Sequence, residues 1–203
     1  MKINLFVFPV ILCFLTSCTS FDSDTFIKDK EPFKQKVNIA VLPFSDAAGH
    51  KDSGINVSDA ITAEIIKIKN WNIVERHQMP KILREQSMEA AGLTAEDYNK
   101  IGKISNIDYI IVGSVSEYYH GRTALVVPKT KLVVNMRIIN ITNGQVAGTG
   151  RYVYGTGKRA WAGCCILGFY YLPVLLLSDE NINKDLNTLA ARVAEDINKQ
   201  ISK

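Results

Sequence analysis

Apolar residues recur along the chain with two different spacings, and each change of spacing marks a predicted strand or helix. The β-branched run VNIAVLPF at 37–44 predicts a buried strand that ends at Pro43. The apolar residues that follow are three or four positions apart, so we expect an amphipathic helix that ends near residue 70. Its inward residues would be Val57, Ile61, Ile65 and Ile68.

The middle of the chain predicts a second strand and two more helices. WNIVER at 71–76 fits the strand. Pro80 suits the first turn of the next helix, where its missing N–H costs no hydrogen bond, and Gly92 suits the end of that helix. Thr94 and Asp97 resemble a capping box, so a third helix is expected to begin there.

The second half of the chain predicts antiparallel strands and a final helix. DYIIVGSVSEYYH at 108–120 and the alternating segment 131–144 are typical of strands, and Asn143-Gly144 is a hairpin signal. The glycines of GTGRYVYGTG then fit a returning strand at 145–157 better than a dinucleotide loop, because no helix follows them. The last helix would bury one face, formed by Leu186, Leu189, Ala190, Val193, Ile197 and Ile201.

This element order predicts an α/β fold. Early alternation of strands and helices indicates an α/β sandwich of two or three layers, to which an antiparallel hairpin and a C-terminal amphipathic helix are added. Hydrophobic residues make up 47% of the 203 positions, which is enough for one core. We therefore expect one α/β domain over 37–203.

The apolar segment 161–177, WAGCCILGFYYLPVLLL, has no charged residue. It is shorter than the about 20 residues that a membrane-spanning helix needs, and it contains glycines and a proline. Three interpretations stay open: it is buried in the core, it forms an oligomer interface, or it enters the bilayer at its surface. In the second and third cases the contact residues would be Trp161, Phe169, Tyr170, Tyr171 and Leu175.

The first 17 residues have the parts of a secretory signal peptide. Lys2 supplies the positive charge and residues 5–14 the short apolar core. The residues LTSC at 15–18 resemble the lipobox of bacterial lipoproteins, which implies cleavage before Cys18 and acylation of this cysteine. Residues 18–36 mix charges with Ser and Pro, so we expect the lipidated cysteine and a flexible tether there. The simpler alternative is a plain signal peptide with an incidental cysteine.

Charge and composition favour no catalytic or nucleic-acid-binding function. Cleavage would lower the net charge from +4 to +3, and no run of five basic residues occurs, so no nucleic-acid partner is expected. The three histidines lack metal-ligand spacing, and no nucleophile or phosphate-loop motif is present. We expect a non-enzymatic protein with no catalytic residue, no metal, no cofactor and no small-molecule substrate.

Several short motifs follow one another in a fixed order along the chain. IAVLPF follows the lipobox and a tether, and the second strand ends at Glu75-Arg76 before a helix that contains Glu85-Gln86. Val112-Gly113-Ser114 and a hairpin from Asn135 to Gly144 come later. Together these segments resemble the lipoproteins of the curli production assembly/transport component (CsgG) family, and the resemblance covers about 37–155 and the final helix.

The resemblance implies a periplasmic α/β domain of nucleotide-binding-like topology that needs no nucleotide. It implies a lipid-anchored outer-membrane protein that forms a homo-oligomer or binds an envelope partner and acts in curli-type secretion or assembly. The alternative function is a lipid-tethered module that regulates a cell-wall (peptidoglycan) synthase. Channel members insert two membrane hairpins; between Tyr119 and Lys131 only HGRTALVVPKT is available, which is too short for one.

Overall fold

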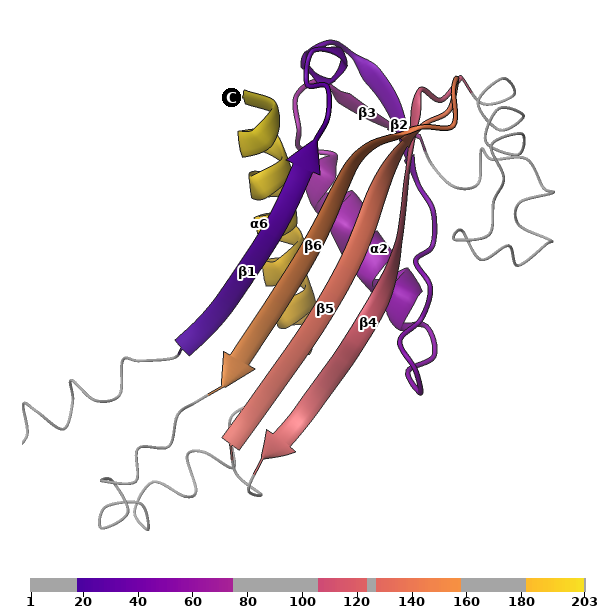
Figure 1. The fold of residues 1–203 in the computed structure, drawn as a ribbon. Coiled ribbons are helices and arrows are strands. Elements are labelled where there is room, and N and C mark those ends of the chain that lie inside the picture. Colours follow the sequence, from indigo (N-terminus) through magenta and orange to yellow (C-terminus); the bar gives the residue numbers. More distant parts are fainter. Residues whose placement is uncertain (1–17, 75–105, 124–126, 158–181, 203) are drawn as a thin grey trace, which may run out of the picture.

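The computed structural model describes residues 18–74, 106–123, 127–157 and 182–202. The described strands form one six-stranded sheet in the order β1-β6-β5-β4-β2-β3 (Figure 1). The strands are β1 (Cys18–Ile27), β2 (Val37–Val41), β3 (Trp71–Val74), β4 (Tyr109–Thr123), β5 (Val127–Asn140) and β6 (Val146–Gly157). The helices are η1 (Pro32–Lys34), α2 (Ser53–Ile65) and α6 (Ile182–Ser202).

The sheet has a parallel half and an antiparallel half. β2 lies between β3 and β4 and is parallel to both. β4, β5, β6 and β1 continue the sheet with antiparallel pairing, and these four strands are the long ones. The parallel pairs need crossover connections, whereas β5 and β6 are joined by the tight turn at Asn143-Gly144, where Gly144 has a φ of 68°.

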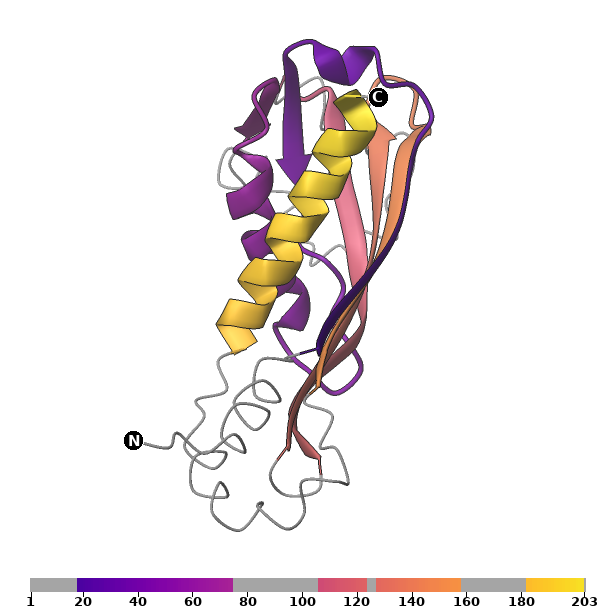
Figure 2. The same cartoon turned by 90° about the vertical axis from the view of Figure 1, so that its left-hand side faces the viewer.

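Helices α2 and α6 lie side by side on one face of the sheet (Figure 2). The predicted inward residues of both helices are buried against this face. Inward residues of β2, such as Ile39 and Val41, belong to the same core cluster. Because successive strand residues point to opposite faces, the residues between them lie on the other side. There they form a second buried cluster of Ala40, Leu42, Ile107, Ile110, Val112, Ile139 and Ile141.

Most predicted elements within the described residues are present. The strand at 37–44, the helix after it, the strand beginning at Trp71, and the hairpin at 131–157 are confirmed. β4 and β5 pair from Tyr119 with Lys131 as far as Thr123 with Val127, so the described residues of 119–131 belong to these two strands and not to a further hairpin. The helices predicted after Pro80 and Thr94 lie outside the described residues, as does the apolar segment 161–177.

The prediction of a flexible tether is wrong for the first part of 18–36. Cys18–Ile27 form β1, which pairs with β6 along its whole length, and Pro32–Lys34 form η1. Phe33 of η1 contacts Trp71 and Tyr109 in the core, with the Phe33 and Tyr109 ring centroids 4.6 Å apart. The polar composition suggested a tether because β1 is an edge strand whose outward residues, such as Asp22 and Asp24, face water.

Candidate functional site

Cys18 is the first residue of β1 and lies opposite Gly157, the last residue of β6. Gly157 in turn lies opposite Lys129 of β5, near the start of that strand. β4 ends at Thr123, which pairs with Val127. Four strands therefore begin or end at the same end of the sheet (Figure 1). We call this part of the fold the Cys18 end and define it by Cys18, Thr123, Val127 and Gly157.

The first turn of α6 is held at the Cys18 end by a partly buried hydrogen-bond cluster. Thr130 of β5 donates its hydroxyl proton to Asp185 Oδ2 at 2.5 Å, and Tyr154 of β6 donates to Asp185 Oδ1 at 3.0 Å. His120 Nδ1 of β4 is 3.0 Å from Thr130 Oγ1. Since the single hydroxyl proton of Thr130 is used towards Asp185, the imidazole must donate to Thr130.

A second cluster of the same composition holds the middle of α6. Thr25 Oγ1 of β1 lies 2.6 Å from Asp196 Oδ2 and 2.9 Å from the hydroxyl of Tyr152 on β6. A carboxylate only accepts, so Thr25 donates to Asp196 and Tyr152 donates to Thr25. Asp185 thus bonds directly to a threonine and a tyrosine, whereas Asp196 bonds to Thr25 and is linked to Tyr152 through it, and together the two clusters fix α6 to three strands.

The environments of the two tyrosines keep both phenols protonated. Burial, with the hydrogen bond and charge of Asp185, raises the pKa of Tyr154 to about 12. Burial raises the pKa of Tyr152 further, and the charge of Asp196 adds to the rise. Both hydroxyls therefore act as hydrogen-bond donors at neutral pH, which suits a role in holding α6 rather than in exchanging protons.

The loop between β2 and α2 is fixed by its own side chains. Asp46 accepts hydrogen bonds from the backbone N–H groups of Gly54 at 2.7 Å and Asp52 at 3.1 Å, so it satisfies donors at the start of α2. The ring of His50 lies against Tyr118 of β4 with centroids 5.5 Å apart. The contact with Tyr118 therefore gives His50 a structural role in packing this loop against β4.

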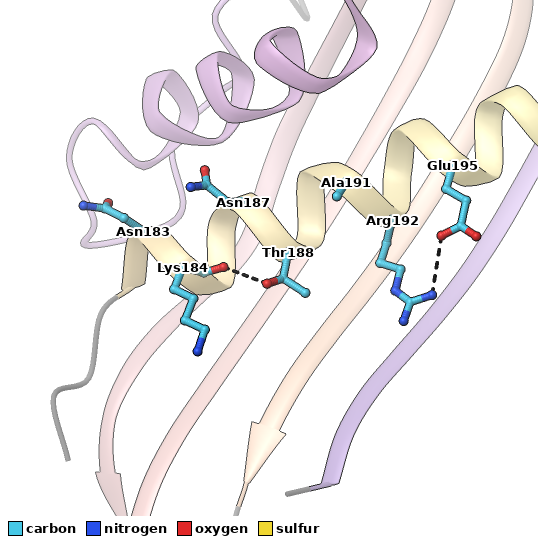
Figure 3. Close-up of a pocket in the computed structure, with 7 residues that line it drawn as sticks. All are labelled: Asn183, Lys184, Asn187, Thr188, Ala191, Arg192 and Glu195. Carbon is cyan, nitrogen blue, oxygen red and sulfur yellow. Dashed lines mark hydrogen bonds and ion pairs between the residues drawn. The ribbon is translucent and has the colours of Figure 1, made fainter. Parts of the chain in front are cut away.

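A shallow depression of about 530 Å³ runs along the surface of α6 (Figure 3). Thr188 donates to the backbone carbonyl of Lys184 at 2.8 Å, and Arg192 lies 3.5 Å from Glu195. Such exposed pairs are weak, and all the lining side chains come from one helix, so the depression offers no set of converging groups. The lining residues are Asn183, Lys184, Asn187, Thr188, Ala191, Arg192 and Glu195.

The predicted contact residues of the apolar segment lie outside the described residues. These are Trp161, Phe169, Tyr170, Tyr171 and Leu175. Their described neighbours along the chain are Gly157, at the end of β6, and Ile182, at the start of α6, and both belong to the region of the Cys18 end. Within 18–74, 106–123, 127–157 and 182–202, no helix is long and apolar enough to cross a membrane, and no three potential ligands gather around a metal position.

The sequence nominates Cys18, which stays a prediction, and it does not reveal the two clusters that fix α6. Asp185 and Asp196 are eleven positions apart, which is close to three helical turns and places both on one face. Their role is not visible in the sequence because their partners come from β1, β5 and β6, far away along the chain. The repeated Tyr152 and Tyr154 on one face of β6 was the available signal for buried hydroxyl partners.

Comparisons with known proteins agree on the fold. The PelC dodecamer from Paraburkholderia phytofirmans matches with a TM-score of 0.51 and 12% identity, over 87% of this chain and 94% of that one. The lipoprotein GNA1162 from Neisseria meningitidis matches with a TM-score of 0.50 and 19% identity, over 69% and 96%. At these identities the likeness shows a shared fold.

The C-terminal domain of LpoB from Escherichia coli is more distant. It matches with a TM-score of 0.42 and 11% identity, over 58% of this chain and 81% of that domain. No curated protein matches the sequence. Residues 23–124, just over half of the chain, match the sequence family described as curli production assembly/transport component CsgG. This match includes β2, β3 and most motifs of the resemblance, although not the hairpin from Asn135 to Gly144, and the chain belongs to the CsgG family.

Proposed function

We propose that the protein is a non-enzymatic lipoprotein of the outer membrane that serves secretion or assembly at the cell envelope. It is anchored by acylated Cys18, with its domain in the periplasm, and it acts through protein contacts as a homo-oligomer or with an envelope partner. Membership of an assembly/transport family supports the role, and the LTSC motif supports the anchor. The dodecameric state of PelC, a protein of the same fold, supports an assembly.

One observation carries this proposal further than the family does. β1 begins at Cys18 itself, so an acyl group there is followed at once by a paired strand. With no tether between lipid and sheet, the domain rests directly on its membrane. A fixed position at the membrane suits a protein that assembles around an exit route.

The same observation weighs against the alternative, a module that regulates a peptidoglycan synthase from the end of a lipid tether. Such a module has to reach away from its anchor, and the reach comes from flexible residues after the cysteine. Here β1, η1 and β2 leave only short connections within 18–41. The likeness to LpoB is too distant to favour this alternative.

Two measurements on cells that express the full chain test the proposal. Radiolabelled palmitate should enter the wild-type protein and not the Cys18→Ala variant, which should also keep its signal peptide. Native mass measurement of the detergent-extracted wild-type protein should give a multiple of the subunit mass. Equal palmitate labelling of both proteins would refute the anchor, and a monomer that co-purifies with a penicillin-binding protein would support the alternative.

A further inference from the structure

We propose that the Cys18 end of the fold binds an anionic phospholipid surface, with Lys129 and Lys184 in contact with headgroup phosphates. The inference deepens the proposed function, because the anchor at Cys18 would bring this end to a bilayer. The basic charge of this end does not depend on acylation of Cys18, so its binding to phospholipid can be tested in a protein without the acyl group.

The charged residues in the outermost rows of the sheet are all basic. A row here means residues that lie opposite one another on neighbouring strands. The row nearest the Cys18 end is Cys18–Gly157–Lys129, and the row Ser20–Gly155–Lys131 lies two residues further from that end. Residues 119–123 of β4 flank both rows. These segments of the four strands contain Arg122, Lys129 and Lys131 and not one Asp or Glu.

The acids nearest to these rows are Glu117, Asp185 and Asp22; the first two are already engaged, whereas Asp22 of β1, opposite Val153, is exposed. Glu117, one row further from the tip, forms an ion pair with Lys131 at 2.7 Å. Asp185, in the first turn of α6, is turned inward and accepts hydrogen bonds from Thr130 and Tyr154. Lys131 is therefore neutralised locally, and the exposed cations that remain for an external partner include Lys129 and Lys184.

The Asp185 cluster places Lys184 at the Cys18 end on the side of the sheet that α6 covers, whereas Lys129, next to the inward Thr130, points to the other side. Thr130 lies between Lys129 and Lys131 on β5, and its bond to Asp185 fixes the start of α6 beside this strand. Lys184 directly precedes Asp185 and is exposed, as is Lys129. Within the described residues, neither lysine takes part in an ion pair. The two ammonium groups thus come from different elements and serve one end of the fold.

The opposite end of the fold has both signs of charge. There, β1 leads through Lys28, Asp29 and Glu31 to η1, and Lys34 pairs with Glu31 at 2.6 Å. Asp108 accepts a hydrogen bond from the backbone of Asn38 beside the start of β2. The strand axis therefore has a basic end and a mixed end, and only the basic end matches a surface of phosphate groups.

An exposed aromatic side chain supports a lipid partner over a soluble anion. Tyr119 lies opposite Lys131 on the outward face of the sheet, and 44% of its surface is exposed. Tyrosine is enriched at membrane–water interfaces, where its ring contacts apolar chains and its hydroxyl stays hydrated. Lysines that flank such a ring are typical of a surface that lies against headgroups.

The test uses the mature chain, residues 18–203, with Cys18→Ser, so that no acyl group contributes. All described strands and helices lie within this chain. Binding is measured by co-sedimentation with vesicles of phosphatidylcholine alone and of phosphatidylcholine mixed with phosphatidylglycerol. The variant Lys129→Gln/Lys184→Gln is compared with a matched control at the opposite end, Lys28→Gln/Lys36→Gln, whose lysines are also exposed.

We expect the Cys18→Ser chain to prefer the phosphatidylglycerol vesicles, with an affinity that falls as salt is added. Loss of two surface cations should weaken this binding about 30-fold, while the control pair should change it less than about threefold. Free inorganic phosphate should not compete, because the partner is a surface. Equal binding to both vesicle types, equal effects of the two double variants, or full competition by phosphate would overturn the inference. None of these results depends on palmitate or on oligomer mass.

Discussion

Thr130 of β5 donates a 2.5 Å hydrogen bond to Asp185 of α6, and this contact joins the sheet to the helix at the end where β1 begins. The two residues are 55 positions apart in the sequence. The bond uses the one proton of Thr130 and leaves its oxygen to accept from His120. Removal of this hydroxyl therefore breaks two contacts in a place that water does not readily reach.

The variant Thr130→Val keeps the shape of the side chain and removes the hydroxyl. Asp185 and His120 would each lose a partner, so the free energy of unfolding should fall by about 1–3 kcal/mol in chemical denaturation. The control Thr149→Val makes the same change at an exposed position of β6 and should stay within about 0.5 kcal/mol of the wild type. Equal stability of the two variants would mean that the cluster contributes nothing.

Tyr154 should make the free energy of unfolding depend on pH in the alkaline range. Its pKa is about 12 in the folded protein against an ordinary value of 10.0. Above pH 10 the unfolded chain loses this proton while the folded protein keeps it, so the unfolded state binds fewer protons. The contribution of Tyr154 to the free energy of unfolding should therefore be intact below pH 10, fall as the pH rises towards 12, and level off above that value.

The variant Tyr154→Phe identifies this contribution. Chemical unfolding measured from pH 10 to 12 should show a shallower decline in the variant than in the wild type, whatever the difference between them at neutral pH. Tyrosinate absorbance of the folded proteins provides a second measurement, since the wild type should show one more late-ionising phenol than Tyr154→Phe, in which Tyr152 still ionises late. Parallel declines in the two proteins would show that Tyr154 titrates in the ordinary range.

Gly54, at the start of α2, should not tolerate a side chain. A Cβ atom there would lie 1.9 Å from the backbone oxygen of Phe44. The backbone cannot relieve this clash by changing rotamer, as a side chain could. Gly54→Ala should lower the free energy of unfolding by about 3 kcal/mol. At Gly121 the nearest atom to a Cβ is the Tyr119 hydroxyl at 3.1 Å, at the tip of an exposed side chain, so Gly121→Ala should be close to neutral. Similar losses in both variants would contradict this difference.

Ile61 anchors α2 on the sheet. It is fully buried, and its truncation to alanine should cost about 2–5 kcal/mol of stability through lost contacts and a residual cavity. Ile55 belongs to the same helix with 42% of its surface exposed, so Ile55→Ala should have little effect or a small stabilising one. Differential scanning calorimetry of the two variants gives the comparison, and an unchanged midpoint for Ile61→Ala would contradict the assigned face of α2.

The sequence predicted those elements whose burial shows in local spacing. Val57 and Ile61 on α2, or Leu189 and Val193 on α6, are apolar at helical spacing because one face of each helix meets the core. β1 escaped prediction because its inward residues include Thr25, a polar residue whose hydrogen-bond partners are Tyr152 and Asp196. The motif LTSC predicts a role for Cys18, but the position of this residue opposite Gly157 depends on a pairing across more than half of the chain.

If Cys18 is acylated, as we propose, the start of β1 at this residue also limits the symmetry of any assembly. An acylated Cys18 turns the same end of every subunit towards the bilayer, because no flexible residues separate the lipid from the strand. Subunits in one leaflet then share a common polarity along the strand axis. Rotation axes along the membrane normal preserve this polarity, whereas a two-fold axis in the membrane plane reverses it. Cyclic arrangements of any order are compatible with the anchor, and dihedral ones are not.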